Sequence, residues 1–175
     1  SFQFKYQKLD IREVAADLEN AVRCARSPQA RALMEVDRVL VSPNWREVPR
    51  RMEEALAGTT CDEGTWVEVA PVFGLAEAFL ERSRRMIECD PLNFYNYFSE
   101  GTTLLWLDQP AAAYEAAQRG LARTPGHPFL EVLVVKALVQ QGRLDAALAA
   151  AETMTSWARD NAVATVLAAQ GNIED

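Results

Sequence analysis

Apolar side chains recur at helical spacing along most of this 175-residue chain. An early stripe consists of Ile11, Val14, Leu18 and Ala21, which follow one another at intervals of three or four residues. In a helix such positions share one face, whereas a half-buried strand hides every second residue. Alanine, leucine, arginine and glutamate are abundant, and alternating Val/Ile/Thr-rich runs are absent. The pattern therefore predicts an all-α protein.

Two proline-containing turns, at residues 89–93 and 123–127, reveal an internal repeat. Their prolines, Pro91 and Pro125, lie 34 residues apart. The repeat between them has a large aromatic residue, Tyr97, near its start and small residues at Gly101 and Gly120. A 34-residue helix-turn-helix period of this kind is typical of tetratricopeptide repeats, and the chain resembles that family. In the family the small positions lie where two helices cross closely.

The repeats on either side keep this phase with different fidelity. After Pro128 a Gly142-Arg143-Leu144-Asp145 turn is similar to the family's inter-helix turn, and Asp145 is predicted to cap the helix that follows. Before Pro91, Trp66 and Phe73 fit positions 4 and 11 of a repeat only if about three residues are missing near Phe73-Gly74-Leu75. An irregular antiparallel bundle with chance periodicity is the alternative.

The resemblance implies one α-solenoid, a right-handed superhelix of antiparallel helix-turn-helix repeats that covers residues 1–175. The predicted elements are a leading helix at about 10–26, repeats at about 29–57, 63–90, 94–124 and 128–154, and a trailing helix at about 157–170.

The resemblance also implies a concave groove lined by the first helix of each repeat. The predicted partner-binding residues are Tyr95, Phe98, Thr102, Leu105, Phe129, Val132, Lys136 and Val139. The corresponding positions of the two earlier repeats are Ala30, Leu33, Asp37, Leu40, Gly64, Val67 and Pro71. Such a groove is apolar and partly aromatic, which favours a protein or peptide partner that is an amphipathic helix or an extended apolar segment.

Two other occupants of the groove stay open at this point. The chain's own segment Ser1–Tyr6, with alternating Phe2, Phe4 and Tyr6, could fill it, and copies of the chain could associate near Trp157 and Leu167. The family's grip on chaperone C-termini needs lysine and asparagine at positions 5 and 9. Neither residue stands at those positions in the repeats compared here, so a carboxylate clamp is not expected.

The charge of the chain argues against a nucleic-acid partner. The net charge is −7, and residues 59–175 hold sixteen acidic side chains against eight basic ones, so this part repels phosphates. The apolar stretches are too short to cross a membrane, and no charged-then-apolar leader opens the chain. Three widely spaced cysteines without a C-x-x-C pair suggest neither a zinc site nor a disulfide framework. We therefore expect a cytoplasmic protein.

Candidate catalytic chemistry is sparse in this sequence. The one histidine, His127, lies in a turn between Gly126 and Pro128, where we expect no partner for it. The glycines are scattered and form no phosphate-binding loop. Cys24 and Cys89 are interpreted as small packing residues rather than nucleophiles. No enzyme activity, cofactor or metal is predicted.

The sequence thus predicts a partner-binding scaffold that is part of a longer protein and resembles bacterial tetratricopeptide-containing proteins. A sensory or regulatory repeat region of a signalling protein or transcription regulator is the alternative. It depends on one turn, Asn44-Trp45, which is similar to turns in the repeats of such proteins. An attached effector domain would separate the two hypotheses.

Overall fold

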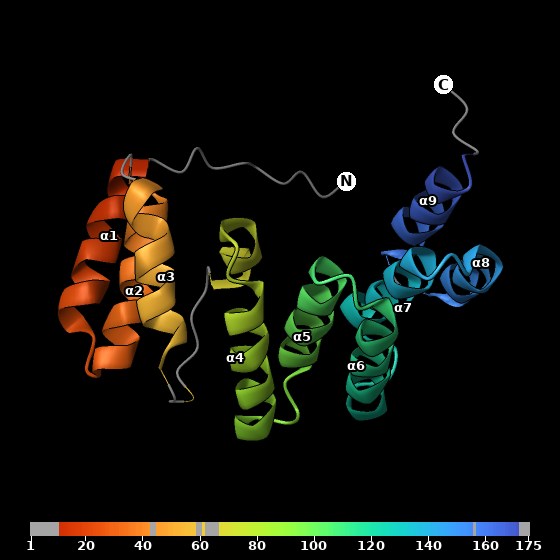
Figure 1. The fold of residues 1–175 in the computed structure, drawn as a ribbon, viewed down its shortest axis with the longest axis horizontal. Helices are drawn as coiled ribbons and strands as arrows, with labels where there is room; N and C mark the ends of the chain where they lie inside the picture. The colour runs from red at the N-terminus through yellow and green to blue at the C-terminus, as the bar shows by residue number, and fades with distance from the viewer. Residues whose placement is uncertain (1–10, 43–44, 59–60, 62–66, 156, 172–175) are drawn as a thin grey trace. The chain divides into compact units, whose positions relative to one another are not determined.

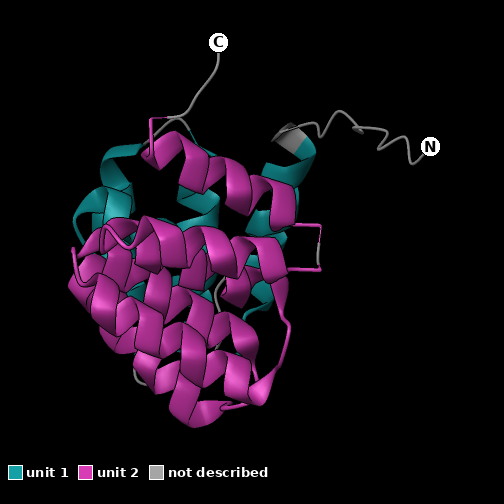
Figure 2. Cartoon of the chain, turned by 90° about the vertical axis from the view of Figure 1, so that its right-hand side faces the viewer, with its two compact units in different colours: residues 1–75 teal, residues 76–175 magenta. Residues whose placement is uncertain are grey.

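A computed structural model describes residues 11–42, 45–58, 61, 67–155 and 157–171 of the chain. For residues 11, 12, 67 and 68 it describes the backbone alone. The described residues form α-helices and short 3-10 helices and contain no strand (Figure 1), which confirms the predicted all-α class. The chain divides into two compact units, residues 1–75 and residues 76–175 (Figure 2). Each unit is considered separately.

Unit 1 contains three α-helices and two 3-10 helices. In chain order these are α1 (Ile11–Cys24), α2 (Pro28–Leu40), η1 (Trp45–Glu47), α3 (Val48–Leu56) and η2 (Val67–Phe73). The hydroxyl of Ser27 accepts a hydrogen bond from the amide of Ala30 (2.9 Å), which caps α2, and Pro28 follows at its first position. A proline there costs nothing, because the first amides of a helix have no intrahelical partner.

The core of unit 1 forms where α2 packs against α3. The apolar residues of the two helices that are at most 3% exposed are Leu33, Val36, Val39, Val48, Met52, Ala55 and Leu56. One polar contact joins the pair: the side-chain amide of Gln29 donates to the carbonyl of Ala55 at 2.6 Å. The pair is therefore held mainly by large apolar side chains that fill the space between two helices.

Unit 2 contains six α-helices: α4 (Ala76–Cys89), α5 (Phe94–Trp106), α6 (Pro110–Arg123), α7 (Pro128–Gln140), α8 (Leu144–Thr153) and α9 (Arg159–Ala169). Each helix packs against the next one in the chain, and α7 also packs against α5 and α9. Since α5, α7 and α9 would be first helices of successive repeats, every second helix meets its repeat equivalent. The sequential packing is observed; the solenoid is treated below as part of the proposed function.

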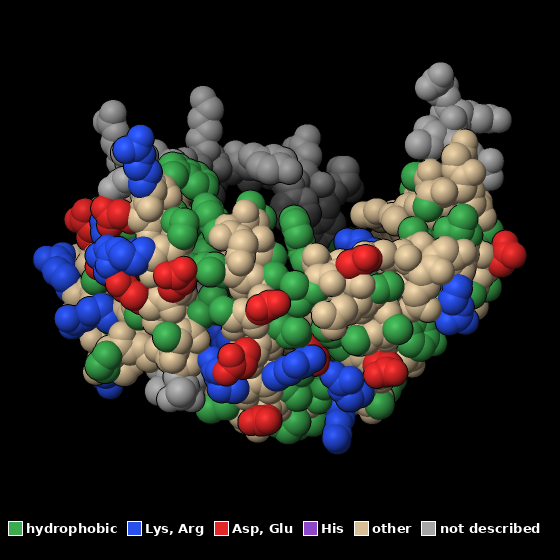
Figure 3. All heavy atoms as spheres, viewed as in Figure 1, with side chains coloured by type: hydrophobic (Ala, Val, Ile, Leu, Met, Phe, Trp, Pro, Cys, Tyr) green, Lys and Arg blue, Asp and Glu red, His purple; other side chains and the backbone are tan. Residues whose placement is uncertain are grey.

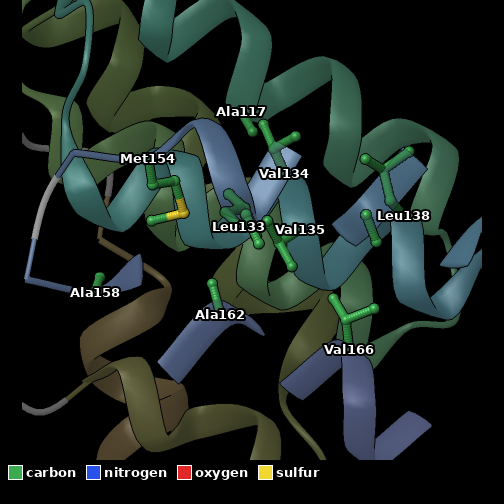
Figure 4. Close-up of a cluster of buried hydrophobic side chains, with 11 residues drawn as sticks. Ala117, Leu133, Val134, Val135, Leu138, Met154, Ala158, Ala162 and Val166 are labelled. Carbon is green, nitrogen blue, oxygen red and sulfur yellow. The ribbon is translucent and has the colours of Figure 1, made fainter. Parts of the chain in front are cut away.

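The main core of unit 2 surrounds α7 (Figure 4). Leu133, Val134, Val135 and Leu138 of this helix lie against Ala117 of α6 and against a set from the last part of the chain. That set comprises Ala147, Ala151, Met154, Ala158, Ala162 and Val166. Helix α7 is apolar on nearly all sides, as expected for a helix covered by several neighbours.

Two glycines allow α5, α6 and α7 to approach closely. A Cβ atom at Gly101 would overlap the side chain of Leu133 and lie 3.3 Å from the carbonyl oxygen of Ala113. A Cβ atom at Gly120 would lie 2.8 Å from Leu130 Cδ1 and 2.9 Å from Tyr97 Cβ. The prediction that these small residues mark close helix crossings is confirmed.

The turn that ends a first helix recurs three times with the predicted period. Gly74, Asp108 and Gly142 adopt positive φ angles of 78°, 55° and 71°, and each is 34 residues from the next. The amide after each of them donates to the carbonyl five residues earlier, in the bonds Leu75 to Ala70 (3.0 Å), Gln109 to Leu104 (2.8 Å) and Arg143 to Leu138 (3.0 Å). This is the helix-terminating geometry that a left-handed residue permits.

This shared turn corrects the register predicted for the second repeat. Ala70, rather than Phe73, takes the place that Leu104 occupies one period later. Because the period is complete across the turn, the prediction of missing residues near Phe73-Gly74-Leu75 is wrong. The segment before the turn is a 3-10 helix with Pro71 inside it, and a proline cannot donate the backbone hydrogen bond of an α-helix.

The remaining boundaries lie within a few residues of the predicted ones. One predicted cap is wrong: α8 begins at Leu144, its N-cap is Arg143, and no side chain caps it, so Asp145 lies inside the first turn. The predicted self-filling segment Ser1–Tyr6 lies outside the described residues. None of the described helices combines the length and the hydropathy that a membrane span requires.

Candidate functional site

The start of α5 is held firmly against the end of α4 and the turn between them. The side-chain amide of Asn96 donates to the carbonyls of Met86 (3.1 Å) and Asp90 (3.2 Å). The hydroxyl of Tyr97 donates to the carbonyl of Pro91 at 3.1 Å, and Asn93 caps the helix by accepting from the amide of Tyr95. These bonds fix the direction in which the first turn of α5 presents its aromatic side chains.

The start of α7 is positioned by a stacked pair of rings. His127, the residue before α7, stacks on Phe94 with ring centroids 3.6 Å apart and an interplanar angle of 25°. The prediction that this histidine lies in its turn without a partner is therefore wrong. Its Nδ1 atom is buried and has no hydrogen-bond partner among the described residues. The stack joins the beginnings of α5 and α7, so their aromatic side chains lie close together.

Four aromatic side chains form a continuous line, which we call the aromatic row: Tyr95, Phe98, Phe129 and Trp157. The ring centroids are 6.1 Å apart from Tyr95 to Phe98, 5.4 Å from Phe98 to Phe129, and 6.0 Å from Phe129 to Trp157. Such separations are those of rings in favourable tilted and edge-to-face contact. The row spans α5, α7 and the connection from α8 to α9, and it lies wholly within unit 2.

The aromatic row is open to solvent along much of its length. Trp157 is 73% exposed, Phe129 41% and Tyr95 40%, whereas Phe98 is half-buried. Large apolar side chains are seldom left this exposed in a group, and contiguous exposed patches tend to mark interaction sites. Tyrosine and tryptophan are also the residues that most often dominate the energy of protein interfaces.

The other predicted groove residues differ from the row in their environment. Leu105, Val132 and Val139 are half-buried and pack against the core around α7. Thr102 is half-buried as well, and Lys136 is exposed. The structure thus brings together the aromatic part of the predicted site, while its aliphatic part contributes to the protein's own core.

The groove positions predicted in the first repeat are corrected by the structure. Leu33 and Asp37 are only 1% and 3% exposed and lie in the interior of unit 1. Ala30 and Leu40 are half-buried. Of the second-repeat positions, Pro71 is half-buried in η2, while Gly64 and the side chain of Val67 lie outside the described part of the chain. An exposed groove lining is therefore not observed at Leu33 and Asp37, because helix packing uses these positions.

The aromatic row lies in a neighbourhood without formal charge. Neither residues 91–99 nor residues 124–130 contain an Asp, Glu, Lys or Arg. The next carboxylate along α5, Glu100, is 4% exposed and is neutralised by Arg84 of α4 (3.2 Å) and Arg119 of α6 (2.5 Å). On the face drawn in Figure 3, acidic and basic side chains are interspersed, with hydrophobic ones between them. The row therefore suits an uncharged ligand.

Sequence reasoning missed three members of this arrangement or their roles. Phe94 and His127 lie 33 residues apart, and only the packing of α5 on α7 makes them stack. Trp157 was predicted as part of a self-association surface and not as an extension of the predicted groove. Glu100 carries a signal that could have been read: the equivalent residue one period later is the buried Val134, so a charge there needs partners.

The cysteines and candidate metal ligands were compared with the same expectations. Cys24 is a free, exposed thiol, but Cys61 and Cys89 are each disulfide-bonded. The interpretation of Cys89 as a packing thiol is therefore wrong, and these two cysteines lend no support to the predicted reducing compartment. Among the described residues, no group of three or more His, Cys, Asp or Glu side chains is arranged to hold a metal ion.

Comparisons of the chain with protein-family models, with curated proteins and with solved structures give no match.

Proposed function

We propose that this protein is a non-catalytic scaffold that binds an apolar segment of another polypeptide at the aromatic row. The observation that carries the proposal is that Tyr95, Phe129 and Trp157 are 40% or more exposed while in contact with one another or with Phe98. Holding such rings in water is unfavourable unless a partner covers them, and aromatic anchors concentrate binding energy.

The repeat architecture supports this proposal. The 34-residue recurrence of the turns at Gly74, Asp108 and Gly142 and the packing of α7 on α5 and α9 agree with a tetratricopeptide-like α-solenoid. Stacked repeats of this kind create extended binding surfaces from the first helices. We include the solenoid and the family likeness in the proposal, as expectations that rest on the repeat pattern.

A selection of displayed random peptides tests the proposal. The full chain is immobilised beside a Tyr95→Glu/Phe129→Glu variant and a Trp106→Glu control. Trp106 is 60% exposed, and none of the ring contacts within the row includes it, so the control places a charge on an equally open aromatic side chain. Circular dichroism first checks that all three forms have the same helical content.

We expect apolar peptides to be enriched on the wild type and on the Trp106→Glu control, and to be lost on the double variant. A charge placed on a desolvated apolar contact costs several kcal/mol, which corresponds to a loss of roughly a hundredfold or more in affinity. Enrichment of the same peptides on all three forms would locate binding elsewhere. If no peptide is enriched on any form, the scaffold proposal fails.

A further inference from the structure

Building on the proposed function, we propose that the aromatic row receives a neutral, proline-rich segment of a partner protein in the polyproline II conformation. Three features of the row distinguish this occupant from an amphipathic helix: the absence of charge, the spacing of the rings and an exposed indole donor. The other occupants considered above, a second copy of the chain and a helix, become outcomes of the test.

The charge of the surroundings favours a neutral ligand. Residues 91–99 and 124–130, which supply most of the row, carry no formal charge, and the nearby Glu100 is already paired with two arginines. A basic or acidic segment would lose hydration here without gaining an ion pair with these residues. Apolar and proline side chains carry no such penalty.

The spacing of the rings matches an extended chain. Successive ring centroids in the row are 5.4–6.1 Å apart. A polyproline II chain rises about 3.1 Å per residue, so two residues advance by about the separation of neighbouring rings. Proline rings can therefore lie against successive aromatic faces, as they do in aromatic-lined grooves that recognise proline-rich segments.

The hydrogen-bonding capacity of Trp157 separates an extended chain from a helix. Trp157 is 73% exposed, and its indole N–H donates no hydrogen bond among the described residues. The backbone carbonyls of a polyproline II chain have no internal partners and can accept from this indole, whereas the carbonyls of a bound helix are already satisfied within the helix. Only the extended ligand uses the donor that the row presents.

Preorganisation on both sides favours the pairing. The row is anchored by the hydrogen bonds of Asn96 and Tyr97 and by the stacking of His127 on Phe94, so little order has to be gained on binding. A proline-rich chain also populates its bound conformation when free, which lowers the entropic cost of association.

The experiment titrates the full chain with two capped, neutral peptides. One consists of repeated Pro-Pro-Leu triplets, and the other is an uncharged amphipathic helix former with leucines on one face and glutamines on the other. Binding is followed by isothermal titration calorimetry and by the indole N–H resonance of Trp157, which a Trp157→Phe variant assigns. The variants Trp157→Ala and Phe129→Ala are compared with Trp106→Ala, an exposed tryptophan whose ring contacts do not include the row.

We expect the proline-rich peptide to bind, to shift the Trp157 indole resonance and to bind roughly tenfold more weakly to Trp157→Ala and Phe129→Ala, as for loss of an aromatic anchor. Trp106→Ala should keep the wild-type affinity. Circular dichroism establishes that each variant is folded, and Trp157→Phe retains the ring but not the donor, so it should show an intermediate loss.

The contrary outcomes are distinct from failure of the proposed function. If the helical peptide binds with the same sensitivity to Trp157→Ala and the proline-rich peptide does not, the inference is overturned while the scaffold proposal stands. If neither peptide binds but the random-peptide selection succeeds at the row, the inference alone fails. If sedimentation shows a dimer that Trp157→Ala dissociates, the occupant is a second copy and the inference is again overturned.

Discussion

Two helix pairs in this protein, α2–α3 in unit 1 and α5–α6 in unit 2, solve the same packing problem in opposite ways. Between α2 and α3 the space is filled with large side chains, and neither helix contains a glycine. In α5 and α6 one glycine each, Gly101 and Gly120, removes side-chain atoms so that backbones approach. The first pair should therefore be sensitive to the removal of atoms and the second to their addition.

The largest effect is expected from Met52→Ala in α3. Met52 is completely buried between α2 and α3, and its truncation removes apolar contacts and leaves a cavity, at a cost of about 3 kcal/mol. Urea denaturation and amide hydrogen exchange of α2 and α3 measure the loss. An unchanged exchange pattern in unit 1 would contradict the idea that this pair depends on filled volume.

Gly101→Ala in α5 is expected to destabilise unit 2 by about 1–2 kcal/mol. The added methyl overlaps the buried side chain of Leu133, and the resulting strain outweighs the gain in helix propensity of up to about 1 kcal/mol. In a Leu133→Ala background, which is itself destabilised, the same substitution should cost nothing, because the cavity accommodates the methyl. Urea denaturation of the four proteins of this double-mutant cycle tests the coupling, and additive losses would refute the close approach.

Glu100→Gln is expected to destabilise unit 2 by about 1–2 kcal/mol, since the buried carboxylate joins Arg84 of α4 to Arg119 of α6. The figure allows for the exposure of about half of each arginine side chain, which weakens the ion pairs by solvent screening. The matched control is Glu54→Gln in α3, where the ion pairs with Arg50 and Arg51 lie on the surface and should contribute nothing measurable. Equal urea midpoints for the two variants would contradict this assignment.

The smallest effect concerns the pH dependence of Glu54. The hydrogen bond from Arg51 is the main cause that holds the pKa of this carboxyl below its ordinary value of 4.5, with further help from the charge of Arg50. A lowered folded-state pKa gives stability that is present above the ordinary pKa and lost as the pH falls through the folded value. A carboxyl titration by NMR should show the lowered pKa, and Arg51→Ala should return it towards 4.5.

The sequence allowed a good prediction where the physical cause was local. Helix boundaries followed from Ser27, Asn93 and the prolines that begin α6 and α7, since caps and breakers act within one turn of their own position. The small crossing residues could be predicted because the repeat period marks them. The register before Gly74 could not, because counting residues detects a deletion but does not locate it.

The candidate site was predictable only in part, for a related reason. Tyr95, Phe98 and Phe129 share equivalent positions in successive repeats, so the period brought them together on paper. Trp157 joins them through the connection between α8 and α9, and His127 through ring stacking, and neither contact follows from a periodic rule. Burial of Leu33 and Asp37 also depends on how tightly the neighbouring helices close over them.

The all-round apolar character of α7 has a consequence for the order of events during synthesis. The helix packs against α5 and α6, which precede it, and against α8 and α9, which follow it. When α7 leaves the ribosome, its side towards α9 is therefore uncovered until the residues up to Ala169 have been added. Nascent chains that stall in this interval expose an apolar face, so slow translation of α8 and α9 should increase their aggregation or their need for a chaperone.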